Sequence, residues 1–385
     1  MAPPLAGITV VDFGMYVAGP YVSVILGDLG ARVVKVEPLG GEPGRVYFRG
    51  LAACNRGKRA ISIDMKSAAG AEIVRRICEQ ADVVHHNFKP GVSARLGVDA
   101  STLRRSRPGM IVLETPGYGA SGPRAELPGF DMIFQAYCGH EYHAAGEGNP
   151  PLWYRFAIID FAAGMLGAMA VLGALYRRRR TGEGAALSVS LFDTGIYLLS
   201  ELLKHGDGSV AGVGRMNPAQ TGFHPAESLY QTKDGWIAIA ARDDAMAAAL
   251  ARVLGCEAAA RRARARWGEP ERSAIATRLR EFSTADSQRL LRDAGVWMQP
   301  CRTDAARQLL SSAALRAVGT SLAGTHPKYG GTLQIGPCVS LSATSLDPSD
   351  RDHIPALGEH TRDLLPELGY APADIDALYA RKVVA

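Results

Sequence analysis

Short apolar runs alternate with longer segments of helical periodicity through the first half of the chain. The runs "ITVVDF" (8–13) and "ARVVKVE" (31–37) predict buried strands, and each is followed by a segment with helical spacing. Two further runs, 82–88 and 110–115, predict strands of the same kind. Strands that alternate with helices in this way predict βαβ units and a parallel sheet, and therefore an α/β fold.

The most apolar segment, 156–176, contains one carboxylate, Asp160, and ends on the four arginines 177–180. Its length is about that needed to span a bilayer. The segment is rich in Ala and Gly, however, and a carboxylate at mid-membrane would cost roughly 3 kcal/mol. We therefore expect a buried helix that follows Asp160, with the arginines at its exposed end, and no membrane span.

Composition narrows the class of protein and of ligand. The 385 residues are 47% hydrophobic and 21% charged, which suits a globular protein of two domains. A formal net charge of +5 favours a small anionic ligand and is too weak to indicate nucleic acid. The six cysteines are scattered without a metal-binding or disulfide pattern, so we expect no metal site. The N-terminus lacks the pattern of a signal peptide, and we expect a cytoplasmic protein.

One stretch, "GYGASG" (117–122), matches the dinucleotide-binding pattern of glycines. Pro123 follows it, and no apolar helix begins there to receive a pyrophosphate. The first turn, "FGMYVAGP", also lacks the glycine spacing of a nicotinamide enzyme. The sequence therefore argues against a Rossmann oxidoreductase.

Basic residues gather in two stretches that flank predicted strands. Arg56 and Lys58 lie in "NRGKRAISIDMK", and Lys89 and Arg95 lie in "NFKPGVSARLG". Each residue alone is explained by surface solubility, but their common position beside one sheet predicts a shared anionic site. Phe88 is placed to stack on a base.

Asp160 has two compatible interpretations. As the residue ahead of "FAAGMLGAM", it is expected to cap a helix, because an Asp side chain accepts hydrogen bonds from the first free amides. Those amides and the helix dipole would keep the carboxylate ionised despite burial. An ionised, desolvated carboxylate is a competent nucleophile.

Several stretches together resemble the class III CoA-transferases, which include formyl-CoA transferase and carnitine CoA-transferase. They run in family order over nearly the whole chain, from Leu5 to about Val384. The matching pieces are "PLAGITVVDF", "AGPY", "LGDLGARVVKVEP", "NRGKRAISIDMKS", "ADVVHHNFKPGVSARLG", "GYGASGP", "PGFD", "IIDFAAGMLGAMAVLGAL", "RTGEG" and "LGEHTRDLLPELGY".

The resemblance implies a large Rossmann-like parallel-sheet domain built from both chain ends, a smaller α/β domain, and an interlocked homodimer. It implies that Asp160 is the catalytic nucleophile and that coenzyme A or acyl-CoA is bound as substrate. The implied CoA contacts are Tyr16, Val17, Ala18, Asn87, Phe88 and Arg95, to which the basic stretch adds Arg56 and Lys58. The expected parts are 1–200 for the large domain, 201–225 for a linker or active-site loop, 226–325 for the small domain and 326–385 for the return to the large one.

The sequence departs from the oxalate-specific members of this family at three places. Val17 stands where those members have a glutamine, and the run of glycines that closes over their aspartate is replaced by "GVGRMNPAQTGFHPAE" (212–227). Pro128 stands where some members have a basic residue near CoA, and Arg124 could supply that contact. We therefore do not expect oxalate as the acceptor.

The implied reaction moves CoA from a thioester to a free carboxylic acid, through an anhydride and a thioester of the aspartate. Two alternatives stay open. One is an α-methylacyl-CoA racemase of the same fold, whose Gly-His-Asp motif reads Gly129-Phe130-Asp131 here and lacks the histidine. The other is a CoA-binding protein without catalysis.

The acyl group is the least determined part of the prediction. Arg155 is placed to pair with a second carboxylate, which would favour dicarboxylic acids such as succinate, although a structural ion pair explains it equally well. The candidate residues of the acyl pocket are Phe130, Asp131, His140, Arg155 and His224.

Overall fold

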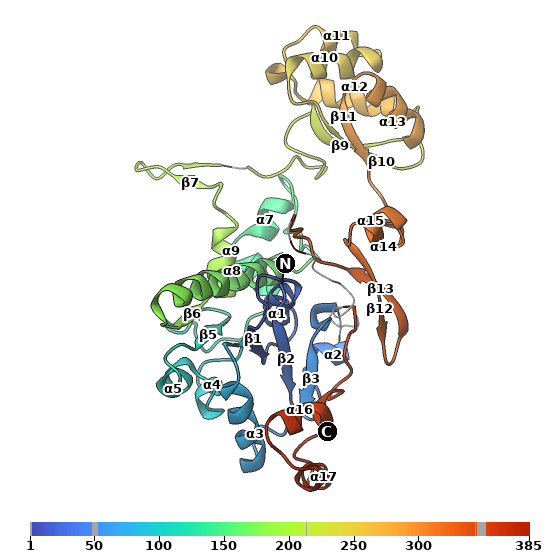
Figure 1. Cartoon of the computed structure of the whole chain (residues 1–385). Helices are drawn as coiled ribbons and strands as arrows, with labels where there is room; N and C mark the ends of the chain where they lie inside the picture. Colours follow the sequence, from blue (N-terminus) through green and yellow to red (C-terminus); the bar gives the residue numbers. More distant parts are fainter. Residues whose placement is uncertain (1, 48–52, 213, 343, 345–351) are drawn as a thin grey trace. The chain divides into compact units, whose positions relative to one another are not determined.

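The computed structural model describes residues 2–47, 53–212, 214–342, 344 and 352–385. These residues form two compact units. The large unit contains residues 1–138, 154–200 and 306–385, and the small unit contains residues 139–153 and 201–305. Each unit is described by itself below (Figure 1).

The large unit is built on a six-stranded parallel sheet in the order β3-β2-β1-β4-β5-β6. The chain moves outward from β1 to β3, then returns to β4 on the other side of β1 and moves outward again. The α/β fold with a parallel sheet is therefore confirmed. The strands are β1 (Thr9–Asp12), β2 (Arg32–Glu37), β3 (Arg59–Ser62), β4 (Val83–His86), β5 (Ile111–Glu114) and β6 (Ala185–Ser188).

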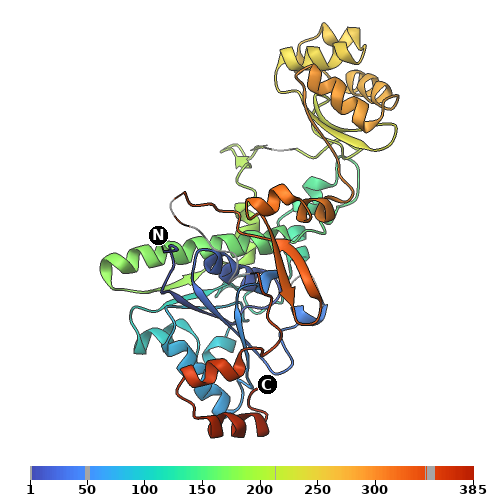
Figure 2. The same ribbon diagram turned by 45° about the vertical axis from the view of Figure 1, so that its right-hand side comes forward.

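Helices cover both faces of this sheet (Figure 2). On one face, α1 (Ala18–Asp28) and α8 (Ile158–Thr181) share a core with Val10, Val33 and Val83. On the other, neighbouring residues such as Val11 and Val84 pack against a second set of helices. Strand residues thus alternate between the two cores, as the pleat requires. The second set is α3 (Ala68–Glu79), α5 (Ala100–Ser106), α16 (Thr361–Glu367) and α17 (Pro372–Ala380).

The C-terminal segment completes the large unit. Val384 forms an antiparallel bridge with Ile63, and the Ala385 amide donates to the carbonyl of Ser62 over 3.2 Å. The last helices therefore pack beside β3, which is an edge strand of the parallel sheet. The same unit also holds α2 (Gly44–Tyr47), α4 (Val92–Arg95), α6 (Asp131–Tyr137), α9 (Leu191–Tyr197), α15 (Ala313–Ala317), most of α14 (Ala305–Leu310), and the hairpin of β12 (Ser321–His326) and β13 (Gly330–Ile335).

Helix α8 lies unusually close to α1 and to the sheet, because small residues face them. A Cβ on Gly167 would lie 2.9 Å from a methyl of Val22 and 3.1 Å from one of Leu113. The helix is long and apolar enough to cross a membrane by length and composition, a test that core helices of soluble proteins also pass. One face belongs to the core of the large unit, but Met165, Met169 and Tyr176 are each more than half exposed, so the helix is buried on one face rather than all round as expected. It ends at Gly182, with the arginines 178–180 in its last turn.

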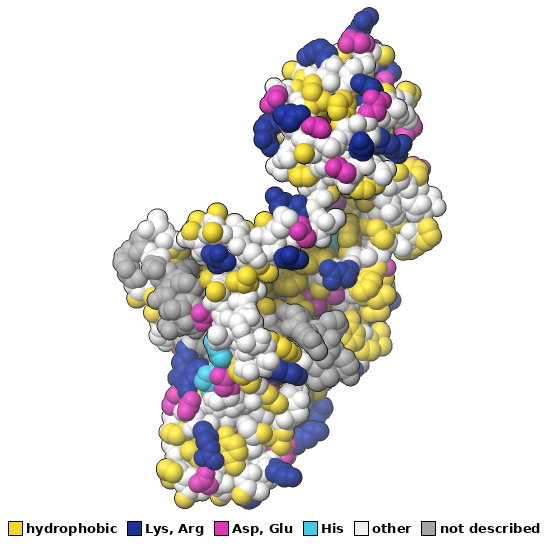
Figure 3. Space-filling view, turned by 90° about the vertical axis from the view of Figure 1, so that its right-hand side faces the viewer, with side chains coloured by type: hydrophobic (Ala, Val, Ile, Leu, Met, Phe, Trp, Pro, Cys, Tyr) yellow, Lys and Arg dark blue, Asp and Glu magenta, His cyan; other side chains and the backbone are white. Residues whose placement is uncertain are grey.

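The small unit contains a three-stranded antiparallel sheet in the order β11-β10-β9. Its buried face, with Tyr230, Ile237 and Ile239, packs on helices through Leu250 and Ile275. On the face drawn in Figure 3, its Lys and Arg side chains are interspersed with Asp and Glu. The elements are α7 (His140–Ala144), β7 (Leu203–Lys204), β8 (Val210–Ala211), β9 (Glu227–Gln231), β10 (Trp236–Ala240), α10 (Asp244–Val253), α11 (Glu257–Ala260), η2 (Arg264–Arg266), α12 (Glu269–Leu279), α13 (Thr284–Asp293) and β11 (Trp297–Pro300).

The packing of α8 gives a matched test of stability. Gly173 lies on the exposed side of the same helix, where a Cβ would meet no described atom within 4 Å. We expect Gly173→Ala to stabilise the protein by about 0.5–1 kcal/mol, because alanine favours helix. Gly167→Ala gains the same propensity but overpacks Val22 and Leu113, which costs about 1–3 kcal/mol. Denaturant unfolding measures both, and equal effects of the two substitutions would contradict the close packing.

Candidate functional site

A cavity of about 380 Å³ lies in the large unit beyond the carboxyl ends of its strands. Its lining comes from the segments that directly follow β1, β4, β5 and β6, together with Asp160 of α8. The strand order reverses between β1 and β4, and such a reversal is where α/β proteins bind ligands. The lining includes Met15, Tyr16, Ala18, Asn87, Phe88, Lys89, Thr115, Gly117, Phe130, Asp160 and Leu191.

The turn after β1 is held in place by two polar side chains. The Asn87 carboxamide accepts a hydrogen bond from the Met15 amide over 2.8 Å and donates to the Met15 carbonyl over 2.9 Å. Tyr16 has a φ of +61°, a conformation that is costly for a residue with a Cβ. Its amide donates to a carboxylate oxygen of the buried Glu42 over 2.9 Å. The predicted contact residues Tyr16 and Asn87 are thus part of one rigid turn.

Below this turn lies a buried charge network. The Asp12 carboxylate accepts hydrogen bonds from the Gly14 amide at 2.7 Å, the Ser23 hydroxyl at 2.6 Å and the Lys58 ammonium at 2.8 Å. Burial alone would raise the pKa of Asp12, but Lys35 and Lys58 hold it well below its usual range. For Lys58, burial outweighs the attraction of Asp12 and lowers the pKa to about 8.

The basic residues of the first predicted stretch have partners inside the protein. Lys58 also donates to the Pro20 carbonyl and to Asn55, so three acceptors surround its ammonium. Arg56 forms a bidentate pair with Asp28, at 2.5 and 2.6 Å. Neither residue is among those that line the cavity. The structure therefore places both in the scaffold around the first turn.

Asp160 lies inside helix α8 rather than ahead of it. The helix begins at Ile158, so Asp160 is its third residue, and the N-cap is Ala157. The expectation that Asp160 caps the helix is therefore wrong. The cap is supplied by Asp131 of α6, whose Oδ2 atom accepts the amides of Ile159 at 2.8 Å and Asp160 at 3.0 Å.

The expectation that the helix amides keep Asp160 ionised is wrong for the same reason. Burial raises the pKa of this carboxyl to about 7, and the neighbouring negative charge of Asp131 adds to the increase. The helix amides that were expected to stabilise the Asp160 carboxylate instead serve Asp131. Asp160 thus exchanges its proton near neutral pH, within the range where a small change of environment switches its charge.

Aromatic and apolar side chains surround this carboxyl. Phe130 lies edge-on to Tyr16 with ring centroids 5.5 Å apart, and Phe88 stacks on the buried His86 at 5.2 Å. An apolar cluster that includes Ala18, Ile159, Ala163 and Leu191 lies around the start of α8.

The other predicted residues lie outside the cavity lining. Val17 is the buried N-cap of α1, and Arg95 is exposed at the end of α4. Arg155 is exposed three residues before α8. His140 and His224 belong to the small unit, where the His224 ring nitrogens contact the Arg264 carbonyl and the Ala226 amide at 3.1 and 3.0 Å.

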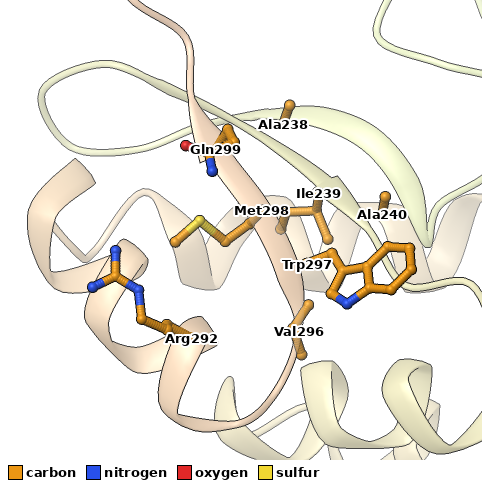
Figure 4. A pocket seen from close by; sticks show the side chains of 8 residues that line it. All are labelled: Ala238, Ile239, Ala240, Arg292, Val296, Trp297, Met298 and Gln299. Carbon is orange, nitrogen blue, oxygen red and sulfur yellow. The ribbon is translucent and has the colours of Figure 1, made fainter. Parts of the chain in front are cut away.

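A second cavity, of about 490 Å³, lies in the small unit beside β10 and β11. Arg292 and Met298 project on one side of β11, and Trp297 projects on the other (Figure 4). Arg292 is the one charged side chain among its eight lining residues. The described residues of the whole chain hold no cluster of three His, Cys, Asp or Glu side chains suited to a metal ion. The first cavity, by contrast, brings Asp160, Tyr16 and Lys89 together in one lining.

The model of CoA-transferase family III matches residues 5–361. The chain belongs to this family. Succinyl-CoA–D-citramalate CoA-transferase from Chloroflexus aurantiacus is 29% identical over 402 residues, with 99% of this chain and 98% of that protein covered. The alpha subunit of succinyl-CoA–L-malate CoA-transferase from the same organism is 31% identical over 263 residues. That match covers 65% of this chain and spans 61% of the length of the subunit.

A solved structure of the same kind supports the assignment of the fold. The crystal structure of a CaiB/BaiF family protein from Brucella suis superposes with a TM-score of 0.83 at 27% identity. The superposition covers 96% of this family III chain and 100% of that one. The predicted family and fold class are therefore confirmed, whereas the interlocked homodimer stays a prediction.

The raised pKa of Asp160 predicts a pH-dependent stability. The unfolded chain ionises this carboxyl near its ordinary pKa of 3.8, and the folded chain only near pH 7. Stability is therefore fully present below pH 3.8 and is lost as the pH rises to about 7. The side chain of Asp160→Asn does not ionise, so this variant keeps its stability as the pH rises. We therefore expect the melting temperature of the variant minus that of the parent to be a few degrees larger at pH 8 than at pH 5.

The control for this experiment is Asp99→Asn, which alters a partly exposed helix-capping carboxylate of the large unit. Asp99 caps α5 through the Thr102 amide, and hydrogen bonds lower its pKa to about 2 although partial burial opposes them. Its contribution is lost only as the pH falls through that value, so its effect is expected to be equal at pH 5 and pH 8. A flat difference for Asp160→Asn as well would contradict the raised pKa.

Proposed function

We propose that the protein transfers CoA from an acyl-CoA thioester to a free carboxylic acid, with Asp160 as the nucleophile. The observation that carries this proposal is the Asp160 carboxyl at the wall of the cavity beyond the strand ends. Membership of CoA-transferase family III and the activities for which the two Chloroflexus relatives are named support it.

In the first step, a carboxylate oxygen of Asp160 attacks the thioester carbonyl. The new C–O bond gives a mixed anhydride, and the electron pair of the broken C–S bond leaves with CoA thiolate. The thiolate then attacks the carbonyl of Asp160, which forms an aspartyl-CoA thioester and expels the first acid as a carboxylate. The acceptor carboxylate repeats both steps in reverse, so that Asp160 is regenerated and no net proton is consumed.

The cavity suits the substrate and the intermediates of this reaction. Tyr16, Ala18, Asn87 and Phe88 line it and are proposed to contact acyl-CoA, with Lys89 as a cationic side chain on the same wall. An anhydride and an activated thioester must be kept from water. Burial is the largest cause of the raised pKa of Asp160, so its partly exposed side chain is already shielded from much of the water, and bound acyl-CoA would cover it further.

The racemase alternative finds no support in this cavity. Phe130 occupies the place of the histidine of the Gly-His-Asp motif, and its ring packs against Tyr16. A phenyl ring carries no exchangeable proton for an acid–base pair. The transferase reading uses the carboxyl that is present and requires no second titratable group.

We further propose a dicarboxylic acid as one of the exchanged acids. Both Chloroflexus relatives are named for succinyl-CoA and for malate or citramalate, each of which carries a second carboxylate. Arg155 lies exposed in the segment that leads into α8, five residues before Asp160, and can pair with a carboxylate through two N–H groups.

The nucleophile is tested by substitution and by trapping. We expect Asp160→Ala and Asp160→Asn to abolish CoA exchange, because neither side chain can form the anhydride. Hydroxylamine added to enzyme that has been incubated with succinyl-CoA is expected to convert Asp160 to a hydroxamate, which mass spectrometry locates. The control Asp99→Asn is expected to keep its activity. Normal turnover by Asp160→Asn would overturn the mechanism.

The acceptor is tested with a panel of mono- and dicarboxylic acids assayed for CoA exchange. We expect Arg155→Ala to raise the KM of a dicarboxylic acceptor by about 10- to 100-fold, because one charged hydrogen-bonded pair, worth about 1.5–3 kcal/mol, is lost. The KM of monocarboxylic acceptors is expected to stay nearly unchanged. Arg179→Ala, at the exposed C-terminal end of α8, is the control. An equal loss for both classes of acid would assign Arg155 a structural role instead.

A further inference from the structure

A single buried carboxylate organises the start of helix α8. Asp131 lies in α6, is 8% exposed, and accepts hydrogen bonds through both of its oxygens, one from α8 and one from within α6. Its Oδ2 atom accepts the amides of Ile159 and Asp160. Its Oδ1 atom accepts the carboxamide N–H of Gln135, one turn later in α6.

The Gln135 side chain extends this arrangement to the segment that enters α8. Its carboxamide nitrogen also lies 3.2 Å from the Tyr154 carbonyl and 3.1 Å from the Phe156 carbonyl. Gln135 is fully buried. The pair Asp131–Gln135 thus fixes the backbone on both sides of Ala157, where the helix begins, and so fixes the backbone from which the Asp160 side chain extends.

Asp131 also determines the electrostatic surroundings of Asp160. The free amides of a helix N-terminus normally stabilise a nearby anion. Here the amides of Ile159 and Asp160 are used by Asp131, and a full negative charge lies beside the carboxyl of Asp160. A second anion at this place is therefore disfavoured.

The other titratable groups around Asp160 come from four further segments. Cys54, which precedes β3, is buried, and burial raises the pKa of its thiol to about 11, so it is neutral. Tyr16 and Lys89 line the same cavity from the segments after β1 and β4. Glu42 bonds the Tyr16 amide and the Gly44 amide through its Oε2 atom.

We propose that Asp131 is a positioning residue that holds Asp160 at the start of α8 and places a second carboxylate beside it. This inference rests on the proposed role of Asp160 as nucleophile. When Asp160 attacks the thioester, its negative charge leaves with the CoA sulfur as the C–S bond breaks. The repulsion between the two aspartates is then relieved, so Asp131 destabilises the ionised reactant more than the anhydride that follows it.

The test is the pH profile of the first half-reaction in Asp131→Asn. Asparagine keeps an oxygen acceptor for the two amides and removes the charge. We expect the acid limb of the rate of hydroxamate formation, measured with succinyl-CoA in a single turnover, to move to lower pH. For each unit of this movement, the rate at pH 5.5 relative to that at pH 8.5 rises up to about tenfold. A purely structural role would lower the rate by one factor at every pH and leave the limb in place, which would overturn the proposal.

Two further measurements keep the result decisive. Asp99→Asn removes a capping carboxylate of the same unit and is expected to leave the acid limb unmoved. The parent protein alone is expected to show its limb near pH 7, so that a limb near pH 4 contradicts the proposal even if Asp131→Asn fails to fold. Absence of a hydroxamate on Asp160 in the parent would refute the proposed function itself, whereas a hydroxamate with an unmoved limb in Asp131→Asn refutes only the role of Asp131.

Discussion

The candidate site of the large unit depends on how the free amides at the buried N-terminus of α8 find hydrogen-bond acceptors. The first amides of α8 point into the protein next to the cavity, where an unpaired N–H group would cost roughly 1–3 kcal/mol. The chain has no capping side chain at Ala157, and Asp131 of another helix accepts two of these hydrogen bonds. This arrangement brings a second carboxylate against Asp160, so the capping of the helix adds to the effect of burial on the acidity of the candidate nucleophile.

The opposite wall of the cavity is stabilised in a comparable way. The turn after β1 is pinned by Asn87 and Glu42 from above and by the Asp12 network from below. Lys58 is buried because its charge is matched by Asp12 and two neutral acceptors. A polar network that is satisfied in this way is rigid, and it allows Tyr16 to keep a backbone conformation with φ of +61°.

Much of this fold could be predicted because local patterns agree with it. The predicted strands at 8–13, 31–37, 82–88 and 110–115 are β1, β2, β4 and β5. Lys58 illustrates what could not be predicted, because a basic residue beside a strand has the same pattern whether it binds a phosphate or a buried Asp.

The capping of α8 could not be predicted from the sequence for a related reason. Asp131 and Asp160 lie 29 positions apart, so only the tertiary structure shows that one caps the helix of the other. The partition of residues 139–153 into the small unit also rests on long-range contacts, such as that of Arg215 with the Asn149 carbonyl. The homodimer, the cytoplasmic location and the CoA contacts stay predictions.

The basicity of Asp160 bears on the direction of the proposed exchange. A mixed anhydride presents two carbonyls to the CoA thiolate, and attack on either one expels the other carboxylate. Attack on the substrate carbonyl expels Asp160 and returns the starting thioester, whereas attack on the aspartyl carbonyl expels the substrate acid. The less basic carboxylate is the better leaving group, and the pKa of Asp160, at about 7, lies above that of an ordinary carboxylic acid. Burial and the neighbouring charge of Asp131, which disfavour the ionised aspartate, therefore also favour passage of CoA onto the enzyme, so that release of the first acid is preferred over reversal.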